Sequence, residues 1–175
     1  PLVSRYLTKV HDYKLVHPYG LSALRNYFRD KWPLEKADHI VTDTKAHLEY
    51  FHEKFNIPKE KLSELYIGND FNNYFPKENI QDNDSFTVGF YGGFIPLQGV
   101  MNILAAAKLL QKDTAIQFDL VGNGFEYQKA LEFIKMNHLG NVSTPGWPNE
   151  TELAQKINSY DLCLGIFGET LKADL

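Results

Sequence analysis

The chain has 175 residues, of which 43% are hydrophobic and 14% aromatic, and its formal net charge is −4. The hydrophobic share is ample for a folded core, while the acidic balance and the scattered lysines exclude a nucleic-acid-binding surface. No apolar run approaches the roughly 18 residues that a membrane-spanning helix requires, and no signal peptide is visible. The single cysteine, Cys163, cannot form an intrachain disulfide, which favours a reducing, cytoplasmic setting.

The first half of the chain predicts helices packed on a short sheet. Residues 1 to 7 predict a strand, and residues 21 to 32 a helix with one apolar face. His39–Thr42 predicts a short strand, and the helix after it ends at Ile57-Pro58. The apolar faces consist of Leu21, Leu24, Phe28 and Trp32 in the first helix and Leu48, Phe51 and Phe55 in the second.

The segment that points most directly to chemistry is an apolar strand that begins at Phe86 and ends in Gly92-Gly93, before a helix that opens near Gln98 and Gly99. Glycines leave backbone N–H groups uncovered, and the positive end of the helix dipole points to the same place. The pattern therefore predicts a phosphate site. Glycine here can also serve only to let the helix and the strand pack closely, and this alternative stays open.

Three further strand patterns follow, with helical patterns between them. They cover residues 115 to 121, 141 to 144 and 161 to 167, and the first two end at the turns Gly122–Gly124 and Pro145–Pro148. Residues 161 to 167, including Cys163, are nearly all apolar, which predicts a strand buried on both faces. Asn149 and Glu152 have the spacing of a capping box. The alternation predicts a doubly wound parallel sheet, with the glycine turns at 92–93 and 122–124 on one edge, where the ligand crevice lies.

In order and spacing, these motifs resemble the C-terminal nucleotide-binding half of retaining glycosyltransferases of the GT-B fold, the group 1 family. The resemblance rests on Phe90–Gly99, Leu120–Gly124, Asn141-Val142, Gly146-Trp147 and Tyr160–Leu164, and in the first half on Ala37–Thr42, Leu65–Asp70 and Phe75-Pro76. It implies an α/β fold of GT-B type, with parts of two Rossmann-like domains that have parallel sheets. It further implies transfer of a sugar from a nucleoside diphosphate donor to an acceptor hydroxyl with retention, in glycan or glycolipid biosynthesis.

The same resemblance implies where the donor binds. The candidate binding residues are Gly92, Gly93 and Gln98 at the diphosphate, Gly122 and Gly124 along the nucleotide, and Gly146 and Trp147 at the base. The candidate catalytic residues are Glu169, as a contact of the donor sugar or ribose, and His11, which follows the predicted first strand and would lie over the donor sugar. His17 competes for that role, and plain solvent exposure remains the alternative for His11 and for Glu169. No cofactor is implied besides the donor.

The chain departs from the family at two positions. Many members carry Arg at the place of Gly93 and Lys at the place of Gln98, and those cations hold the donor diphosphate. A neutral Gln98 can still donate a hydrogen bond to phosphate, but a charge-assisted bond is roughly twice as strong. The family's two-glutamate motif would begin around Phe167–Thr170, which includes Glu169, and finish beyond Leu175. We therefore expect an internal fragment that is inactive alone, made of residues 1–76 from one domain, a polar linker at 77–85, and residues 86–175 from the next.

Metal chemistry is not expected. His47 and His52 are five residues apart on a helix, on different faces, and are expected to be solvated. Asp82-Asn83-Asp84 resembles the Asp-x-Asp metal motif of the other main glycosyltransferase fold, but its place in a polar linker favours a turn.

Two further functions stay open, a nucleotide-sugar epimerase and a non-catalytic nucleotide-binding module of the same fold. The expected partners are a nucleotide-sugar donor and an unknown hydroxyl acceptor, which is a glycan or a lipid-linked sugar. Peripheral membrane association of the full-length protein is also compatible with this function.

Overall fold

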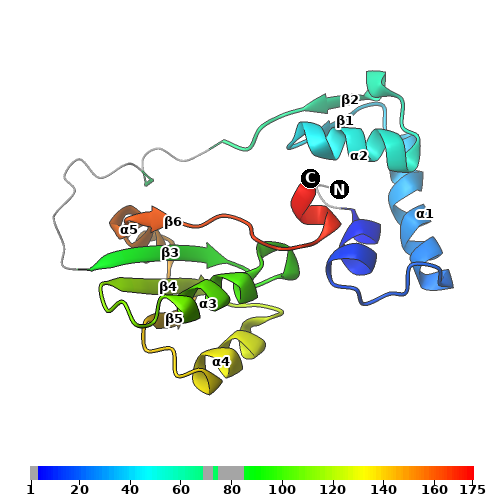
Figure 1. Cartoon of the computed structure of the whole chain (residues 1–175). Helices are drawn as coiled ribbons and strands as arrows, with labels where there is room; N and C mark the ends of the chain where they lie inside the picture. The colour runs from blue at the N-terminus through cyan, green and yellow to red at the C-terminus, as the bar shows by residue number, and fades with distance from the viewer. Residues whose placement is uncertain (1–3, 69–72, 75–84) are drawn as a thin grey trace. The chain divides into compact units, whose positions relative to one another are not determined.

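The computed structural model describes residues 4–68, 73–74 and 85–175. The chain divides into two compact units: Pro1–Gly68 with Thr170–Leu175 form the first unit, and Asn69–Glu169 form the second (Figure 1). Thr170–Leu175, which the sequence analysis placed in the second domain, thus belong to the first unit. The predicted linker at 77–85 lies, apart from Ser85, outside the described residues, as does the predicted turn at Asp82-Asn83-Asp84.

The first unit is built around a parallel strand-helix-strand motif. Its elements are η1 (Leu7–Asp12), α1 (Leu21–Lys36), β1 (Ile40–Thr42), α2 (Lys45–Phe55), η2 (Lys59–Lys61), β2 (Leu62–Glu64) and η4 (Leu171–Asp174). Strands β1 and β2 pair in parallel, with Ile40 beside Leu62. The strand and helix predicted from residue 39 onward are confirmed, with Phe51 and Phe55 buried in the core. The second strand lies on residues 62–64, whereas residues 65–67 are exposed.

The strand predicted for residues 1 to 7 is wrong over its described part. Residues 5 to 12 are helical, and Pro1–Val3 lie outside the described residues. Ser4 provides the physical reason, because its hydroxyl accepts a hydrogen bond from the Leu7 N–H at 3.0 Å, as a serine at the start of a helix does. Leu7 and Val10, three residues apart, are both buried, which is a helical spacing. His11 therefore lies within a helix and not in a loop after a strand.

Helix α1 packs with the opposite face from the one predicted. The predicted core residues on it are exposed, Trp32 by 64% for example, while Asn26 and Asp30 are buried. The carboxylate of Asp30 accepts hydrogen bonds from the Ser4 hydroxyl and the Tyr6 N–H, both at 2.8 Å. A buried carboxylate needs such partners, so the start of η1 fixes which side of α1 turns inward.

The second unit has the predicted doubly wound architecture. Its elements are β3 (Phe86–Gly92), η3 (Pro96–Gln98), α3 (Val100–Leu109), β4 (Ile116–Gly122), α4 (Tyr127–Met136), β5 (Val142–Gly146), α5 (Glu150–Ser159) and β6 (Leu162–Cys163). All four strands are parallel, in the order β5-β4-β3-β6. The predicted capping box of α5 is confirmed, because Asn149 Oδ1 accepts a hydrogen bond from the Glu152 N–H at 2.9 Å and Glu152 Oε2 accepts one from the Asn149 N–H at 3.3 Å.

The last strand is shorter and more exposed than predicted. Strand β6 has two residues and exposes Leu162 by 47%, and within the described residues it pairs with β3 alone. An edge strand at this position is not covered on both faces. The apolar run at residues 161–167 therefore led to a wrong prediction of burial. Cys163 is exposed and not buried, although partial burial of its sulfur still raises the pKa of the thiol.

The two faces of the second sheet differ in chemistry. Val88, Phe90, Phe118 and Leu120 share one face and form the core with α3 and α4. On the other face lies Asp119, whose carboxylate accepts hydrogen bonds from three side chains. The donors are Lys156 at 2.7 Å, Tyr160 at 2.8 Å and Ser143. Helix α5 is thereby fastened to the face opposite α3 and α4.

Asp119→Asn is expected to lower the free energy of unfolding of the second unit by about 1 kcal/mol at neutral pH, because Lys156 loses its counter-ion. Burial raises the pKa of Asp119, but the bonds from Lys156, Ser143 and Tyr160 outweigh it and leave the pKa below its usual value. The carboxylate therefore stabilises the fold above its unfolded pKa of about 3.9, and this contribution disappears as the pH falls through the folded pKa.

Denaturant unfolding of both proteins at several pH values measures this difference. The gap between wild type and Asp119→Asn should close in acid, and the exposed Glu132→Gln serves as the control with no gap. A gap that stays constant down to low pH would mean that Asp119 does not carry the effect as a carboxylate.

Candidate functional site

The predicted glycine turns meet at one edge of the second sheet. In the parallel register of β3 and β4, Gly92 pairs with Gly122. Across β4 and β5, Val121 pairs with Gly146 after a bulge. These positions are at the carboxyl ends of three neighbouring strands, so the prediction of a common edge is confirmed.

Two of the glycines are required by the packing of one turn on the other. A Cβ on Gly122 would lie 1.9 Å from the Gly92 carbonyl oxygen, and one on Gly124 would lie 1.6 Å from that of Gly93. Both have positive φ angles, 135° and 154°. Close packing, the alternative role of glycine that the sequence left open, is therefore sufficient to explain why Gly122 and Gly124 are glycines.

Gly93 and Gly146 have no such constraint. A Cβ on Gly93 would meet nothing closer than Ile95 at 3.6 Å, an ordinary van der Waals distance. A Cβ on Gly146 would meet nothing within 4 Å, although its φ of 80° favours glycine. Open space at these two backbones is what a closely bound ligand would use, so they are the better candidates for contact with a nucleotide.

Gln98 closes the turn after β3. Its Oε1 accepts a hydrogen bond from the Ile95 N–H at 3.4 Å, and its Nε2 lies where it would be 2.3 Å from a Cβ on Gly92. The side-chain amide therefore lies across the Gly92 backbone, at the predicted diphosphate position. Its oxygen is engaged inside the turn, which leaves the Nε2 group as the donor for a phosphate.

Glu169 is brought to the same turn by the segment after β6. The Gly168 N–H donates to the Leu97 carbonyl at 3.0 Å, and the Phe167 N–H to the Gln98 carbonyl at 3.2 Å. Glu169 follows directly and is exposed. Strands β4 and β5 lie on one side of β3 and strand β6 lies on the other, so the order in which strands are added to the sheet reverses at β3. Ligands of open α/β sheets bind at such a switch point.

Three exposed aromatic residues are direct sequence neighbours of the turn glycines. Trp147 is 55% exposed directly after β5, Tyr91 is 49% exposed near the end of β3, and Phe125 is 58% exposed after Gly124. Exposed aromatic rings offer stacking surface to a flat base. Sequence reasoning selected Trp147 but missed Tyr91 and Phe125, which their positions beside the glycine turns could have indicated.

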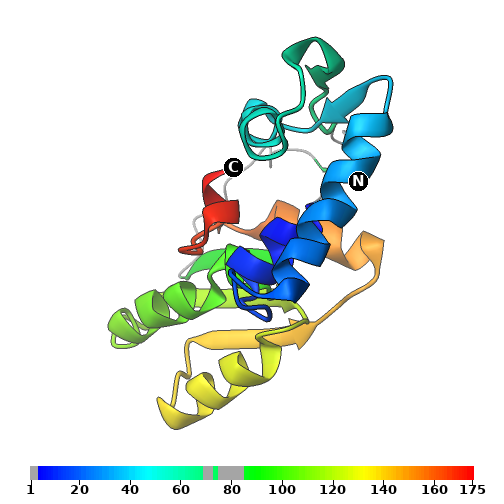
Figure 2. The same ribbon diagram turned by 90° about the vertical axis from the view of Figure 1, so that its right-hand side faces the viewer.

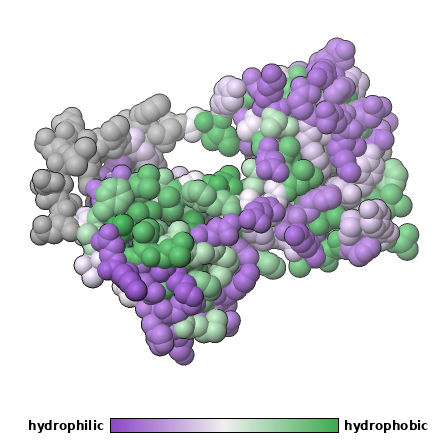
Figure 3. Space-filling model, in the orientation of Figure 1, coloured by the Kyte–Doolittle hydropathy of each residue, from purple (hydrophilic) through white to green (hydrophobic). Residues whose placement is uncertain are grey.

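A separate apolar hollow lies on the core side of this sheet. Its volume is about 290 Å³, and it is lined by Val88, Asn102, Ile103, Ala106, Leu110, Phe118, Leu162, Leu164 and Phe167. Figure 3 shows hydrophobic side chains gathered over this part of the second unit, where α3, β3 and β6 lie. The lining offers no charged group, so this hollow is not the phosphate site.

His11 belongs to the first unit, where its ring packs edge-on against Tyr6 at a centroid distance of 5.3 Å. Burial and the positive charge of Lys54 lower the pKa of His11, which favours a neutral imidazole near neutral pH. His17 is exposed, and its Nδ1 accepts a hydrogen bond from the Tyr19 N–H at 3.4 Å.

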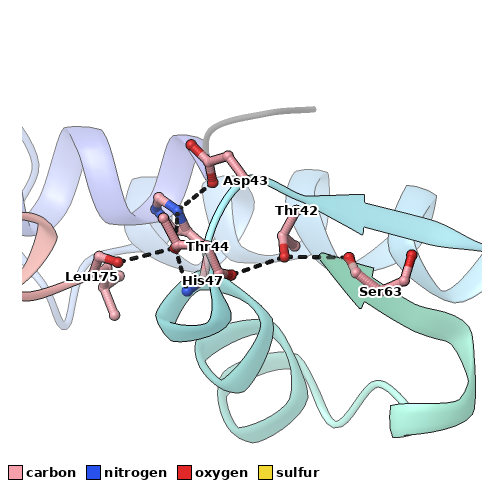
Figure 4. Close-up of polar contacts among 6 residues, drawn as sticks. All are labelled: Thr42, Asp43, Thr44, His47, Ser63 and Leu175. Atoms are coloured by element: carbon pink, nitrogen blue, oxygen red, sulfur yellow. Dashed lines mark hydrogen bonds and ion pairs between the residues drawn. The ribbon is translucent and has the colours of Figure 1, made fainter. Parts of the chain in front are cut away.

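A histidine-aspartate pair at the start of α2 was missed by sequence reasoning. His47 Nδ1 lies 2.8 Å from Asp43 Oδ1 and 3.2 Å from the Thr44 hydroxyl, and the side chains of His47 and Asp43 are only 15% and 26% exposed (Figure 4). Thr44 caps α2 by accepting the His47 N–H, and its hydroxyl donates to the Leu175 carbonyl. The expectation that His47 is solvated is therefore wrong.

His52 is also engaged, through an Nδ1 contact of 2.8 Å with the Ile57 carbonyl. In the described ranges no group of three or more His, Cys, Asp or Glu side chains could hold a metal ion. The two histidines thus stabilise the ends of α2 through local hydrogen bonds.

No protein-family model matches the chain, and no curated protein matches its sequence. Solved structures do match. TarM of S. aureus, crystallised with UDP among its ligands, superposes with a TM-score of 0.66 at 17% identity over 81% of this chain and 27% of its own. HepE of Anabaena, in complex with UDP and glucose, gives 0.66 at 20% identity over 81% of this chain and 41% of its own.

The pneumococcal O-GlcNAc transferase GtfA, in complex with UDP and GlcNAc, gives a TM-score of 0.64 at 16% identity over 83% of this chain and 28% of its own. All three are GT-B glycosyltransferases, and the likeness shows that the α/β fold of this chain is of GT-B type. The chain spans less than half the length of each of them.

Proposed function

We propose that this chain is part of a retaining glycosyltransferase, which moves a sugar from a nucleoside diphosphate donor to a hydroxyl of a glycan or lipid-linked acceptor. The observation that carries the proposal is the open backbone of Gly93 beside Gln98, at the switch point of a parallel sheet. The three structural neighbours crystallised with UDP support it, since they share this fold.

The described residues would bind and orient the donor. The turn at Gly93 approaches the diphosphate, Gly146 and Trp147 face the base, and Glu169 contacts the sugar or the ribose. His11 would lie over the donor sugar, as the family resemblance implies. In this mechanism the departing diphosphate assists the attacking hydroxyl, so the protein positions the reactants and stabilises the developing charge. The donor is the only small molecule required, with no metal or further cofactor.

A non-catalytic nucleotide-binding module is the second candidate. It is favoured by the absence of cations at Gly93 and Gln98, because a glycosyltransferase must stabilise the charge of the leaving diphosphate. Sugar transfer by the full-length protein, measured with labelled donor, separates the two functions.

The proposed setting is the cytoplasm, with a nucleotide sugar as the donor. Among the helices of the described residues, none is long and apolar enough to cross a membrane. The acceptor hydroxyl is unidentified, and lipid-linked sugars are among the proposed acceptors.

Trp147 provides a direct test of nucleotide binding. The chain has two tryptophans, so Trp32→Phe leaves Trp147 as the only indole. Addition of UDP should then change its fluorescence, because the base alters the polarity around this exposed ring. In the converse variant, Trp147→Phe, the remaining Trp32 lies in the first unit and should not respond. A response of Trp32 alone would place the nucleotide elsewhere.

Gln98→Lys should tighten UDP binding by about tenfold, because the ammonium group adds a Coulomb attraction to the diphosphate of about 1–4 kcal/mol, which the neutral amide lacks. Gln98→Met, which matches the length without a charge or a donor, is the control and should weaken binding. Calorimetric titration measures both. Equal affinity of wild type and both variants would show that residue 98 does not touch the diphosphate.

A further inference from the structure

Phe94, the residue that follows Gly92-Gly93, has a backbone conformation that bulky side chains rarely adopt. Its φ is 44°, in the left-handed region, where a large side chain is strained. Strain of this kind persists only where the surrounding contacts impose it, and it is concentrated at binding and catalytic sites. The fold around Phe94 must therefore hold the residue in this conformation.

The ring of Phe94 is anchored in the core of the second unit. The residue is 0% exposed, and its ring packs edge-on against Phe90 of β3 at a centroid distance of 5.8 Å and against Tyr127 of α4 at 5.2 Å. Helix α4, in yellow, lies on the same side of the sheet as α3 (Figure 2). The ring cannot leave this core without exposing its apolar surface to water, so its packing fixes the backbone of residue 94.

Two carbonyl groups fix the orientation of the peptides on either side of Phe94. The Gly93 carbonyl oxygen is directed at Gly124, since a Cβ on that glycine would lie 1.6 Å from the oxygen and 2.7 Å from the carbonyl carbon. The Phe94 carbonyl accepts a hydrogen bond from the Glu126 N–H at 2.8 Å. In a trans peptide the N–H points away from the carbonyl, and the described residues contain no cis peptide bond. The N–H groups of Phe94 and Ile95 are therefore both turned away from the segment after β4.

These two N–H groups have the arrangement of an anion-binding nest, a concavity lined by successive backbone donors. In an extended strand successive N–H groups point in opposite directions, so the left-handed conformation of Phe94 is what brings them to one side. The Ile95 N–H meets the Gln98 Oε1 at 3.4 Å, which is long for such a bond and leaves the donor free to share a stronger acceptor. Within the described residues the Phe94 N–H has no acceptor, although the residue is fully buried. A buried N–H without an acceptor is rare in folded proteins and calls for a ligand atom.

We propose that Phe94 is a positioning residue for the donor diphosphate, and that the N–H groups of Phe94 and Ile95 together bind a phosphate oxygen. This inference rests on the proposed function and deepens it, because it assigns recognition of the phosphate to backbone donors. The half-buried side chain of Gln98 lies against Gly92 and Ile95, and its rotation opens the nest to the ligand while Nε2 remains a donor. Backbone donors of this kind bind an anion without the cations that the resembling family has at residues 93 and 98.

Two isomeric substitutions test the role of this conformation. Leucine and isoleucine have the same volume and fill the core alike, but a β-branched side chain is far less compatible with a positive φ. Phe94→Leu should therefore keep the affinity for UDP within about threefold of wild type, whereas Phe94→Ile should bind UDP about tenfold more weakly than Phe94→Leu. Calorimetric titration with UDP measures both affinities.

The same pair of substitutions at Phe118 is the matched control. Phe118 is 4% exposed in the same core, but it lies in β4, where β-branched side chains are favoured. Phe118→Leu and Phe118→Ile should therefore bind UDP equally well. If Phe94 only fills the core, its two variants will differ in their denaturant unfolding and not in their affinity for UDP. Circular dichroism checks that each variant is folded before titration.

A measurement on the wild-type chain depends on no variant. Addition of UDP should move the amide proton resonances of Phe94 and Ile95 downfield, because a charged oxygen makes a stronger hydrogen bond than a neutral one. Inorganic pyrophosphate should have the same effect, whereas uridine, which carries no phosphate, should leave both resonances in place. If Phe94→Ile does not fold, these shifts decide the question alone.

The inference and the proposed function can fail separately. Equal affinity of Phe94→Leu and Phe94→Ile for UDP, or UDP binding that leaves the amides of Phe94 and Ile95 unmoved, would overturn the inference while the proposed function stands. Amide shifts with pyrophosphate, without sugar transfer by the full-length protein, would keep the nest and contradict the proposed function. No binding of UDP or pyrophosphate to the wild-type chain would overturn both.

Discussion

Gly124→Ala is expected to lower the free energy of unfolding of the second unit by at least about 3 kcal/mol. The added methyl would lie 1.6 Å from the Gly93 carbonyl oxygen, a backbone atom that cannot move aside alone. Its φ of 154° adds strain for any residue with a side chain. Relief requires the two turns to separate, which also breaks the hydrogen bond from the Glu126 N–H to the Phe94 carbonyl.

Denaturant unfolding followed by Trp147 fluorescence in a Trp32→Phe background measures this loss in the second unit. The control is Gly140→Ala, which adds the same methyl where nothing lies within 4 Å. If the two substitutions have equal effects, the turns do not pack as described.

Gly93→Asp is expected to lower UDP affinity by about 100-fold or more, because like charges brought together in a binding site cost several kcal/mol. The position suits a test of charge, since a Cβ there makes only ordinary contacts and the fold should persist. Gly93→Asn has the same shape without charge and should cost far less. Gly93→Arg should tighten binding, because it supplies the cation that many members of the resembling family have at this place.

Isothermal titration calorimetry with UDP measures the three variants beside wild type. From the tightest to the weakest UDP binding, the expected order is Gly93→Arg, wild type, Gly93→Asn and Gly93→Asp. If the UDP affinity does not depend on the charge of residue 93, the diphosphate does not bind at this turn.

The second unit was predictable because its local signals agree with one another. Alternating side chains in β4 assigned one face to the core, and the Asn149 and Glu152 spacing marked the start of α5. Strand-helix alternation then allowed few topologies. The glycine turns could be placed on one edge but not interpreted further. Turn packing at Gly122 and ligand approach at Gly93 both require the same residue type, and only the backbone distances separate them.

The first unit was harder because its faces are chosen by pairs distant in sequence. Helix α1 has an apolar stripe, but its inner face is set by Asp30, whose partners Ser4 and Tyr6 are more than twenty residues away. The partnership of Asp43 with His47 has the spacing of an ordinary surface ion pair, so the sequence alone did not mark it as partly buried. Local periodicity carries no information on which of two possible faces finds its partners.

The central claim is that a nucleoside diphosphate binds at the glycine edge of the second unit. A titration of the isotope-labelled chain with UDP, followed by the backbone amide resonances, tests this residue by residue. The account predicts saturable shifts confined to the backbone amides of residues 92–95, 97–98, 123–125 and 146–147, with the first unit unchanged. Absence of shifts at these amides, or saturable shifts centred on the apolar hollow between α3 and β6, would contradict it.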